Sequence, residues 1–133
     1  HAIMHSRRKL GFTDFSDEEM QTLPPVPQVL VRRHAGSGRM GLYLASHAGR
    51  IFGMNEEEGQ TLLRQLIEHA GQRQFVYTHR WRVHDFVMWD NRCTMHRGKG
   101  YDDLRWPRDM QRATVSDVAP TCEQEGIADP AAA

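Results

Sequence analysis

The strongest structural signal in the sequence is one capped, amphipathic stretch at residues 56–70. Asn55 is a preferred helix N-cap residue, and Glu58 stands at the capping-box position three residues later. Gly71 follows as a stop signal. Apolar side chains fall on one face of this stretch, at Leu62, Leu63, Leu66, Ile67 and Ala70. We therefore predict a helix over 56–70 that packs one side against a sheet.

The rest of the chain has the patterns of β-strands and turns. Large side chains alternate or cluster with β-branched residues in short runs, which predict strands at 29–31, 42–44, 75–81, 86–89, 94–96 and 109–115. A capping box from Ser16 to Glu19 predicts a short helix that the prolines from Pro24 onward must end. Several short strands with one long helix predict a mainly β sandwich or barrel that carries helices, not a βαβ array.

Length and charge narrow the possible functions. The 133 residues suit one small domain, and 17 basic side chains balance 17 acidic ones. Because the chain has no net charge, it has no overall electrostatic attraction to nucleic acid or to an anionic membrane, so we expect neither partner. With no apolar run long enough to span a bilayer, we expect a cytoplasmic protein whose Cys93 and Cys122 are thiols. The composition predicts one domain unit over 1–120 and a flexible tail over 121–133.

The stretch from Trp89 to Thr114 carries the chemistry. It contains Trp-Asp-Asn-Arg at 89–92, then His96, then Arg-x-x-x-Arg-Ala-Thr at 108–114. In this combination the sequence resembles the TauD/TfdA family of iron(II)- and 2-oxoglutarate-dependent dioxygenases, and the resemblance extends over roughly residues 5–117. The family folds as a double-stranded β-helix, or jelly-roll. The chain is therefore expected to be the C-terminal portion of one such domain, nearer to the aryloxyalkanoate-type members.

The resemblance implies a role for three side chains. His96 matches the second histidine of an iron triad of two histidines and one carboxylate, a set that leaves three positions open. Arg108 matches the arginine that binds the distal carboxylate of 2-oxoglutarate, with Arg105 as a competitor for that role. Arg112 matches the arginine that holds an anionic group of the substrate, or the other carboxylate of the cosubstrate. We expect His96, Arg108 and Arg112 to face one cavity, and a His96 ring turned toward solvent would count against this.

The other iron ligands are missing from the chain. In the family they come from an upstream His-x-Asp motif, and no histidine here is followed two positions later by Asp or Glu. We expect a C-terminal fragment, with a natural truncation as the alternative, that is inactive alone.

The full-length protein is expected to be a homo-oligomeric enzyme that hydroxylates a small anionic aryloxyalkanoate- or sulfonate-type compound. It would use O2 and convert 2-oxoglutarate to succinate. A noncatalytic binding module of the same fold remains the alternative function.

His84 departs from the family pattern. Relatives commonly have glycine at this position, before the Asp that begins a strand. If the turn needs a positive φ, His84 costs about 1 kcal/mol more than glycine would.

Overall fold

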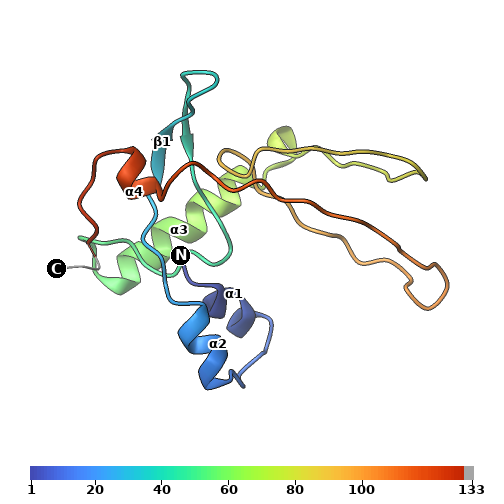
Figure 1. Ribbon diagram of the computed structural model, residues 1–133, viewed down its shortest axis with the longest axis horizontal. Coiled ribbons are helices and arrows are strands. Elements are labelled where there is room, and N and C mark those ends of the chain that lie inside the picture. The colour runs from blue at the N-terminus through green and yellow to red at the C-terminus, as the bar shows by residue number, and fades with distance from the viewer. Residues whose placement is uncertain (131–133) are drawn as a thin grey trace.

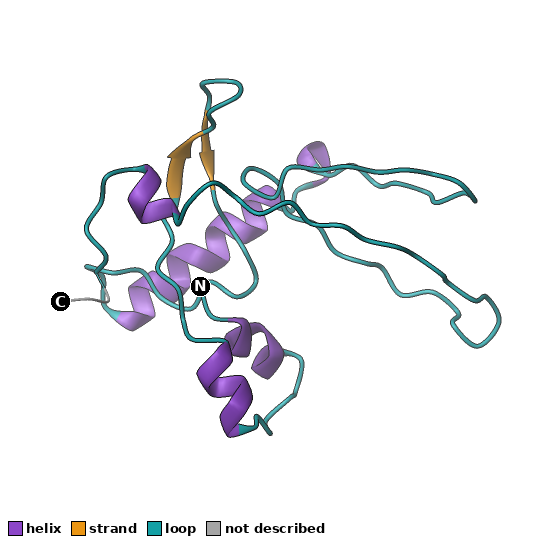
Figure 2. Ribbon diagram, viewed as in Figure 1, coloured by secondary structure: helices purple, strands orange, loops and turns teal. Residues whose placement is uncertain are grey.

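The computed structural model describes residues 1–130 and shows a helical body from which two long arms of irregular chain extend (Figures 1 and 2). We call residues 76–89 the first arm and residues 95–115 the second arm. The elements follow in the order α1 (Ile3–Lys9), α2 (Asp17–Thr22), β1 (Val31–Arg33), β2 (Met40–Leu42), α3 (Glu56–Ala70), the 3-10 turn η1 (Arg73–Phe75) and α4 (Thr121–Gln124).

Helix α3 forms over the predicted residues and organises the core. The Asn55 side chain accepts a hydrogen bond from the Glu58 amide at 2.9 Å, which confirms the predicted N-cap. On the inner face Leu63 is buried against the segment that follows β2, at Leu44 and Ala48. Gly59 lies where a Cβ would reach 3.4 Å from the Ile51 backbone, so this helix face approaches the chain closely. The core is small, and the two arms extend outward from the body that contains it (Figure 1).

Strands β1 and β2 form one antiparallel hairpin in which Arg32 pairs with Gly41. The hairpin confirms two strands separated by a glycine-containing turn, although each is displaced by up to two residues from the predicted range. Its turn begins at His34, whose amide donates to the Arg39 carbonyl at 2.8 Å. Gly38 has a φ of +69° in this turn, a conformation that glycine adopts without a steric penalty.

Two short helices precede the hairpin. In α2 the predicted capping box is present, because Ser16 accepts from the Glu19 amide while the Glu19 side chain accepts from the Ser16 amide. Helix α1 was not predicted, although its last turn holds three basic residues that suit a helix C-terminus. Arg7 of this turn is joined to Glu19 at 2.7 Å, which ties α1 to α2.

Residues 121–124 are attached to β1 at Arg32 and to Val29 just before it, and the flexible tail expected over 121–133 stays a prediction. Thr121 and Cys122 are buried in helix α4. The Thr121 hydroxyl accepts from the Val29 amide at 2.8 Å, and the buried Arg32 guanidinium donates to Gln124 at 2.8 Å. These contacts hold residues 121–124 in a helical turn, whereas residues 131–133 of the predicted tail lie outside the described part.

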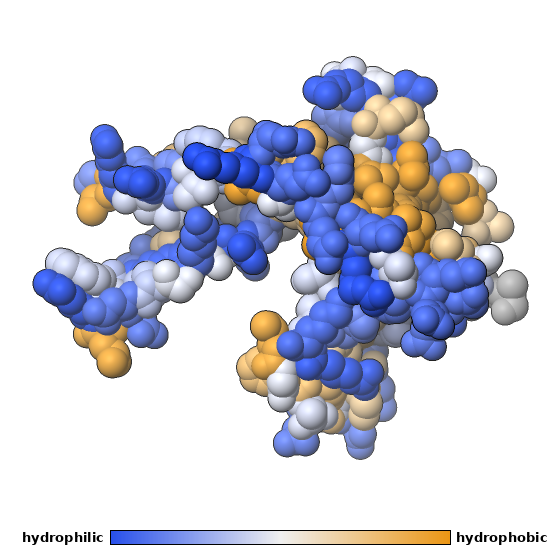
Figure 3. Space-filling view, turned by 180° about the vertical axis from the view of Figure 1, so that it is seen from behind, coloured by the Kyte–Doolittle hydropathy of each residue, from blue (hydrophilic) through white to orange (hydrophobic). Residues whose placement is uncertain are grey.

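The expectation of a mainly β chain is met only in part. Within residues 1–130, β1 and β2 are the only strands, and the predicted strands at 75–81, 86–89, 94–96 and 109–115 run through the arms without a β-ladder. A strand needs a hydrogen-bonded neighbour to satisfy its backbone groups, and no segment of residues 1–130 pairs with the arms in this way. Their apolar side chains stay in solvent: Phe86 is 86% exposed, Leu104 98% and Val115 94%. Figure 3 shows such apolar atoms at the ends of both arms.

Two further expectations can be compared with the structure. Both cysteines are free thiols, with Cys93 exposed and Cys122 buried. No helix in the described range combines the length and apolar character that crossing a membrane requires.

Candidate active-site segment

The loop of residues 90–96 joins the two arms and carries His96. The Asp90 carbonyl accepts from the Thr94 amide at 3.1 Å and from the Thr94 hydroxyl at 2.6 Å, which closes one tight turn. The Trp89 indole donates to the Asn91 side chain at 2.8 Å, and its ring lies 4.7 Å from the His96 ring. Trp89 and the turn at Asp90 therefore set where His96 leaves the loop.

The Asp90 carboxylate is the charged centre of this loop. Arg92 donates to it through Nε and Nη2, at 2.9 and 2.7 Å, and through its backbone amide at 2.9 Å. From the β1–β2 hairpin, His34 places Nε2 3.0 Å from the second carboxylate oxygen. The hydrogen bonds from Arg92, then from His34, hold the pKa of Asp90 well below its ordinary value. The contact between His34 and Asp90 was not predicted, because 56 residues separate the two in the sequence.

His34, Asp90 and Cys93 are the one group of potential metal donors that the described residues bring together, within 4.8 Å of one another. Two observations argue against a metal there. The Arg92 guanidinium already occupies the carboxylate and would repel a cation. His34 Nδ1 accepts from the Ser37 amide at 3.1 Å, so in the neutral ring the proton is on Nε2 and no lone pair faces the group. The arrangement is a hydrogen-bond network, not a metal centre.

The predicted arginines lie in the second arm. Arg108 is exposed, with its guanidinium 5.8 Å from the Tyr101 ring centroid and its Nε against the Met110 sulfur. Arg112 is exposed and has no hydrogen bond or ion pair within residues 1–130. The competitor Arg105 lies over the Trp106 ring at 5.0 Å. Nothing in these contacts distinguishes Arg105 from Arg108 for a carboxylate.

Among residues 1–130 no hydrogen bond, ion pair or ring contact joins His96, Arg108 and Arg112, although Arg108 Nη1 lies 3.9 Å from where a Cβ on Gly98 would stand. The His96 ring is exposed and contacts Trp89, and it shares no contact with either arginine among the described residues. In a closed domain this would count against a common cavity. Here both arms lack the neighbouring strands that would set their direction, so the assignment of the three residues stays a prediction.

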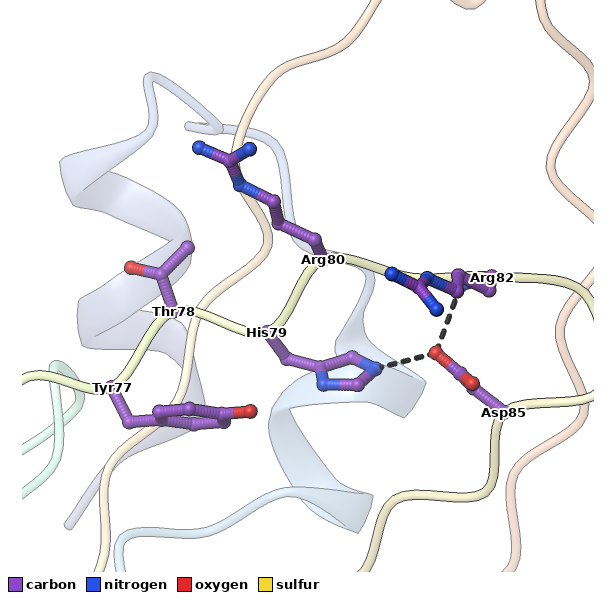
Figure 4. Close-up of a pocket in the computed structure, with 6 residues that line it drawn as sticks. All are labelled: Tyr77, Thr78, His79, Arg80, Arg82 and Asp85. Carbon is purple, nitrogen blue, oxygen red and sulfur yellow. Dashed lines mark hydrogen bonds and ion pairs between the residues drawn. The ribbon is translucent and has the colours of Figure 1, made fainter.

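The first arm turns back at residues 82–85 (Figure 4). The Asp85 amide donates to the Arg82 carbonyl at 3.1 Å, which defines a four-residue β-turn with His84 at its third position. His84 has a φ of +72°, which meets the condition under which the sequence predicted a cost relative to glycine. The Asp85 carboxylate also lies 2.9 Å from His79 Nε2. His79, Arg82 and Asp85 line an open hollow of about 410 Å³ together with Tyr77, Thr78 and Arg80. None of the predicted site residues lines it.

Comparison with known proteins identifies the relatives of this chain. It is 50% identical to the alpha-ketoglutarate-dependent 2,4-dichlorophenoxyacetate dioxygenase of Cupriavidus pinatubonensis, over 90% of this chain and 41% of that protein. It is 34% identical to the (S)-phenoxypropionate/alpha-ketoglutarate-dioxygenase of Delftia acidovorans, over 96% of this chain and 44% of that protein. The chain thus spans about two fifths of the length of the curated relatives it matches.

A solved structure supports the same relationship. The crystal structure of AAD-2 in complex with Mn(II) and N-oxalylglycine matches with a TM-score of 0.84 and 56% identity, over 91% of this chain and 48% of that one. The family model described as taurine catabolism dioxygenase TauD, TfdA family matches residues 1–114, which include the 89–92 motif, His96, Arg108 and Arg112. The chain belongs to the TauD/TfdA family.

Proposed function

We propose that the complete protein is an iron(II)- and 2-oxoglutarate-dependent dioxygenase that acts on a small anionic compound of the aryloxyalkanoate type. The observation that carries the proposal is the signature at 89–114 within a chain 50% identical to a dioxygenase named for 2,4-dichlorophenoxyacetate. A sulfonate substrate is the family alternative, and the named relatives with 50% and 34% identity favour an aryloxy acid.

The residues of this chain fit part of an iron site. No hydrogen bond from a residue in the described range engages either His96 ring nitrogen, so the imidazole can serve as a metal ligand. One histidine cannot chelate an ion, and no second donor of the chain lies with it among the described residues. The remaining ligands would come from a His-x-Asp motif elsewhere in the complete protein, with His96 as the third ligand.

The arginines would bind the two anionic reactants. A guanidinium offers two parallel hydrogen bonds to a carboxylate, so Arg108 suits the distal carboxylate of 2-oxoglutarate and Arg112 the acid group of the substrate. Bound iron would supply the redox chemistry with O2. The balanced reaction yields succinate, carbon dioxide and a hydroxylated substrate, with one oxygen atom of O2 in each of succinate and the substrate. Hydroxylation beside an ether oxygen would then release a phenol.

The test is turnover by the complete protein with iron(II), 2-oxoglutarate and either 2,4-dichlorophenoxyacetate or taurine. We expect succinate and a phenol from the aryloxy acid and little product from taurine. His96→Ala should abolish turnover, and Arg108→Ala should chiefly raise the concentration of 2-oxoglutarate required. Arg105→Ala is the matched control, since an equal effect there would move the carboxylate role to Arg105.

A protein that binds neither iron nor 2-oxoglutarate would overturn the proposal and support a noncatalytic binding module. We also propose that the protein is cytoplasmic and homo-oligomeric. Cell fractionation and size-exclusion chromatography with light scattering would test these two points.

A further inference from the structure

Loop 90–96 is held mainly by its own residues, and among residues 1–130 the hairpin supplies one hydrogen bond to it, from His34. Arg92, Asn91 and Thr94 make hydrogen bonds within the loop or to Trp89. His34 differs from them, because it lies in the turn between β1 and β2 and contacts Asp90 from 56 residues away. This contact connects the loop to the part of the molecule that has a core.

The tautomer of His34 shows which group donates in its hydrogen bond with Asp90. A backbone amide can only donate, so the 3.1 Å bond from the Ser37 amide makes His34 Nδ1 an acceptor. The proton of the neutral ring is therefore on Nε2, which donates to Asp90 at 3.0 Å. The imidazole is held by the turn, because Ser37 Oγ also lies 2.9 Å from Nδ1, and the Gly38 amide donates to the His34 carbonyl at 2.8 Å. A rigid hairpin thus presents one oriented donor to the carboxylate.

The contact between His34 and Asp90 is partly shielded from solvent. The His34 and Asp90 side chains are 21% and 33% exposed, whereas every residue from Asn91 to His96 is exposed. A hydrogen bond to a charged acceptor is among the stronger single contacts in proteins. Since the Asp90 carbonyl closes the turn that leads to His96, movement of Asp90 would also move His96.

We propose that His34 is a positioning residue, whose hydrogen bond to Asp90 holds loop 90–96, and with it His96, against the β1–β2 hairpin. The importance of this role for metal binding rests on the proposed function, whereas the anchoring itself does not. His34 would touch neither metal nor substrate and would act through Asp90.

The experiment compares His34→Ala, His34→Gln and His79→Ala in the complete, metal-free protein by hydrogen exchange. His34→Gln keeps an N–H donor at the right distance. His79 is a matched control, because it makes a similar 2.9 Å contact to Asp85 in the first arm, away from the loop. We expect the peptide with the Cys93 and Thr94 amides to exchange about tenfold faster in His34→Ala. His34→Gln and His79→Ala should resemble wild type there.

Metal binding supplies the second measurement. Mn(II) titration followed by electron paramagnetic resonance should show about tenfold weaker binding in His34→Ala and near wild-type binding in His34→Gln. Wild-type protein that binds no Mn(II) would overturn the proposed function, while the exchange result would still decide the role of His34.

Unchanged loop exchange in His34→Ala, or no recovery in His34→Gln, would overturn the anchoring. A measurement on wild-type protein avoids any folding defect: the ¹⁵N shifts of His34 should show the Nε2–H tautomer. An Nδ1–H tautomer would overturn the proposal.

Discussion

Replacing His84 by glycine should stabilise the protein, because the turn of the first arm forces this residue to a φ of +72°. A residue with a Cβ pays about 1–2 kcal/mol in this left-handed region, and histidine tolerates it better than most residues do. Glycine removes that strain but makes the unfolded chain more flexible, which costs about 0.4–1 kcal/mol. The expected net gain in the free energy of unfolding is therefore about 0.5–1 kcal/mol for His84→Gly.

Urea denaturation of the complete protein would measure this gain as a higher midpoint with an unchanged slope. His84→Ala is the control, because it removes the exposed imidazole and keeps the Cβ that causes the strain. A gain in His84→Ala equal to that in His84→Gly would refute the conformational explanation. A loss of stability in His84→Gly would show that the imidazole makes a contact that outweighs the strain.

Three further perturbations test the body and the loop. Asn55→Ala removes the N-cap bond of α3 and should lower the free energy of unfolding by about 1 kcal/mol, measured by urea denaturation. Leu63→Ala leaves a cavity in the small core and should lower the free energy of unfolding by about 2–4 kcal/mol in the same assay. A smaller loss is expected only if neighbouring side chains move in to fill the cavity. The lowered pKa of Asp90 gives stability that is present above its ordinary value of 3.8 and is lost as the pH falls below it. Asp90→Asn should therefore flatten the acid side of the stability curve, and an unchanged curve would contradict the assigned hydrogen bonds.

The features that the sequence predicted correctly depend on neighbouring residues. The caps at Asn55 and Ser16 each follow from interactions within a few positions, and the sequence marked His84 as a residue that a positive φ would strain. A residue type and its spacing suffice for such features. Helix α4 was missed because its order comes from contacts with Val29 and Arg32, more than 90 residues away, which no local pattern encodes.

The strands predicted in the two arms depend instead on residues that are distant in the sequence. Period-two alternation describes which side of a strand faces a core, but it cannot supply the neighbouring strand that makes the ladder. Full burial of a side chain such as Phe86 or Leu104 is worth about 1.5–3 kcal/mol, and both remain in solvent in this chain. The arms therefore lack the burial of apolar side chains that would otherwise fix their direction.

The identity of the site residues and their arrangement in space have different sources. The motif names His96, Arg108 and Arg112 because their order along the chain matches a family that the comparison with residues 1–114 establishes. His96 follows the tight turn at Asp90, at the start of the second arm, and both arginines lie further along the same arm. Among residues 1–130, the turn before His96 is joined to the folded body through the hydrogen bond between His34 and Asp90. We expect strands that pair with the second arm in the complete protein to decide whether the two arginines align with His96.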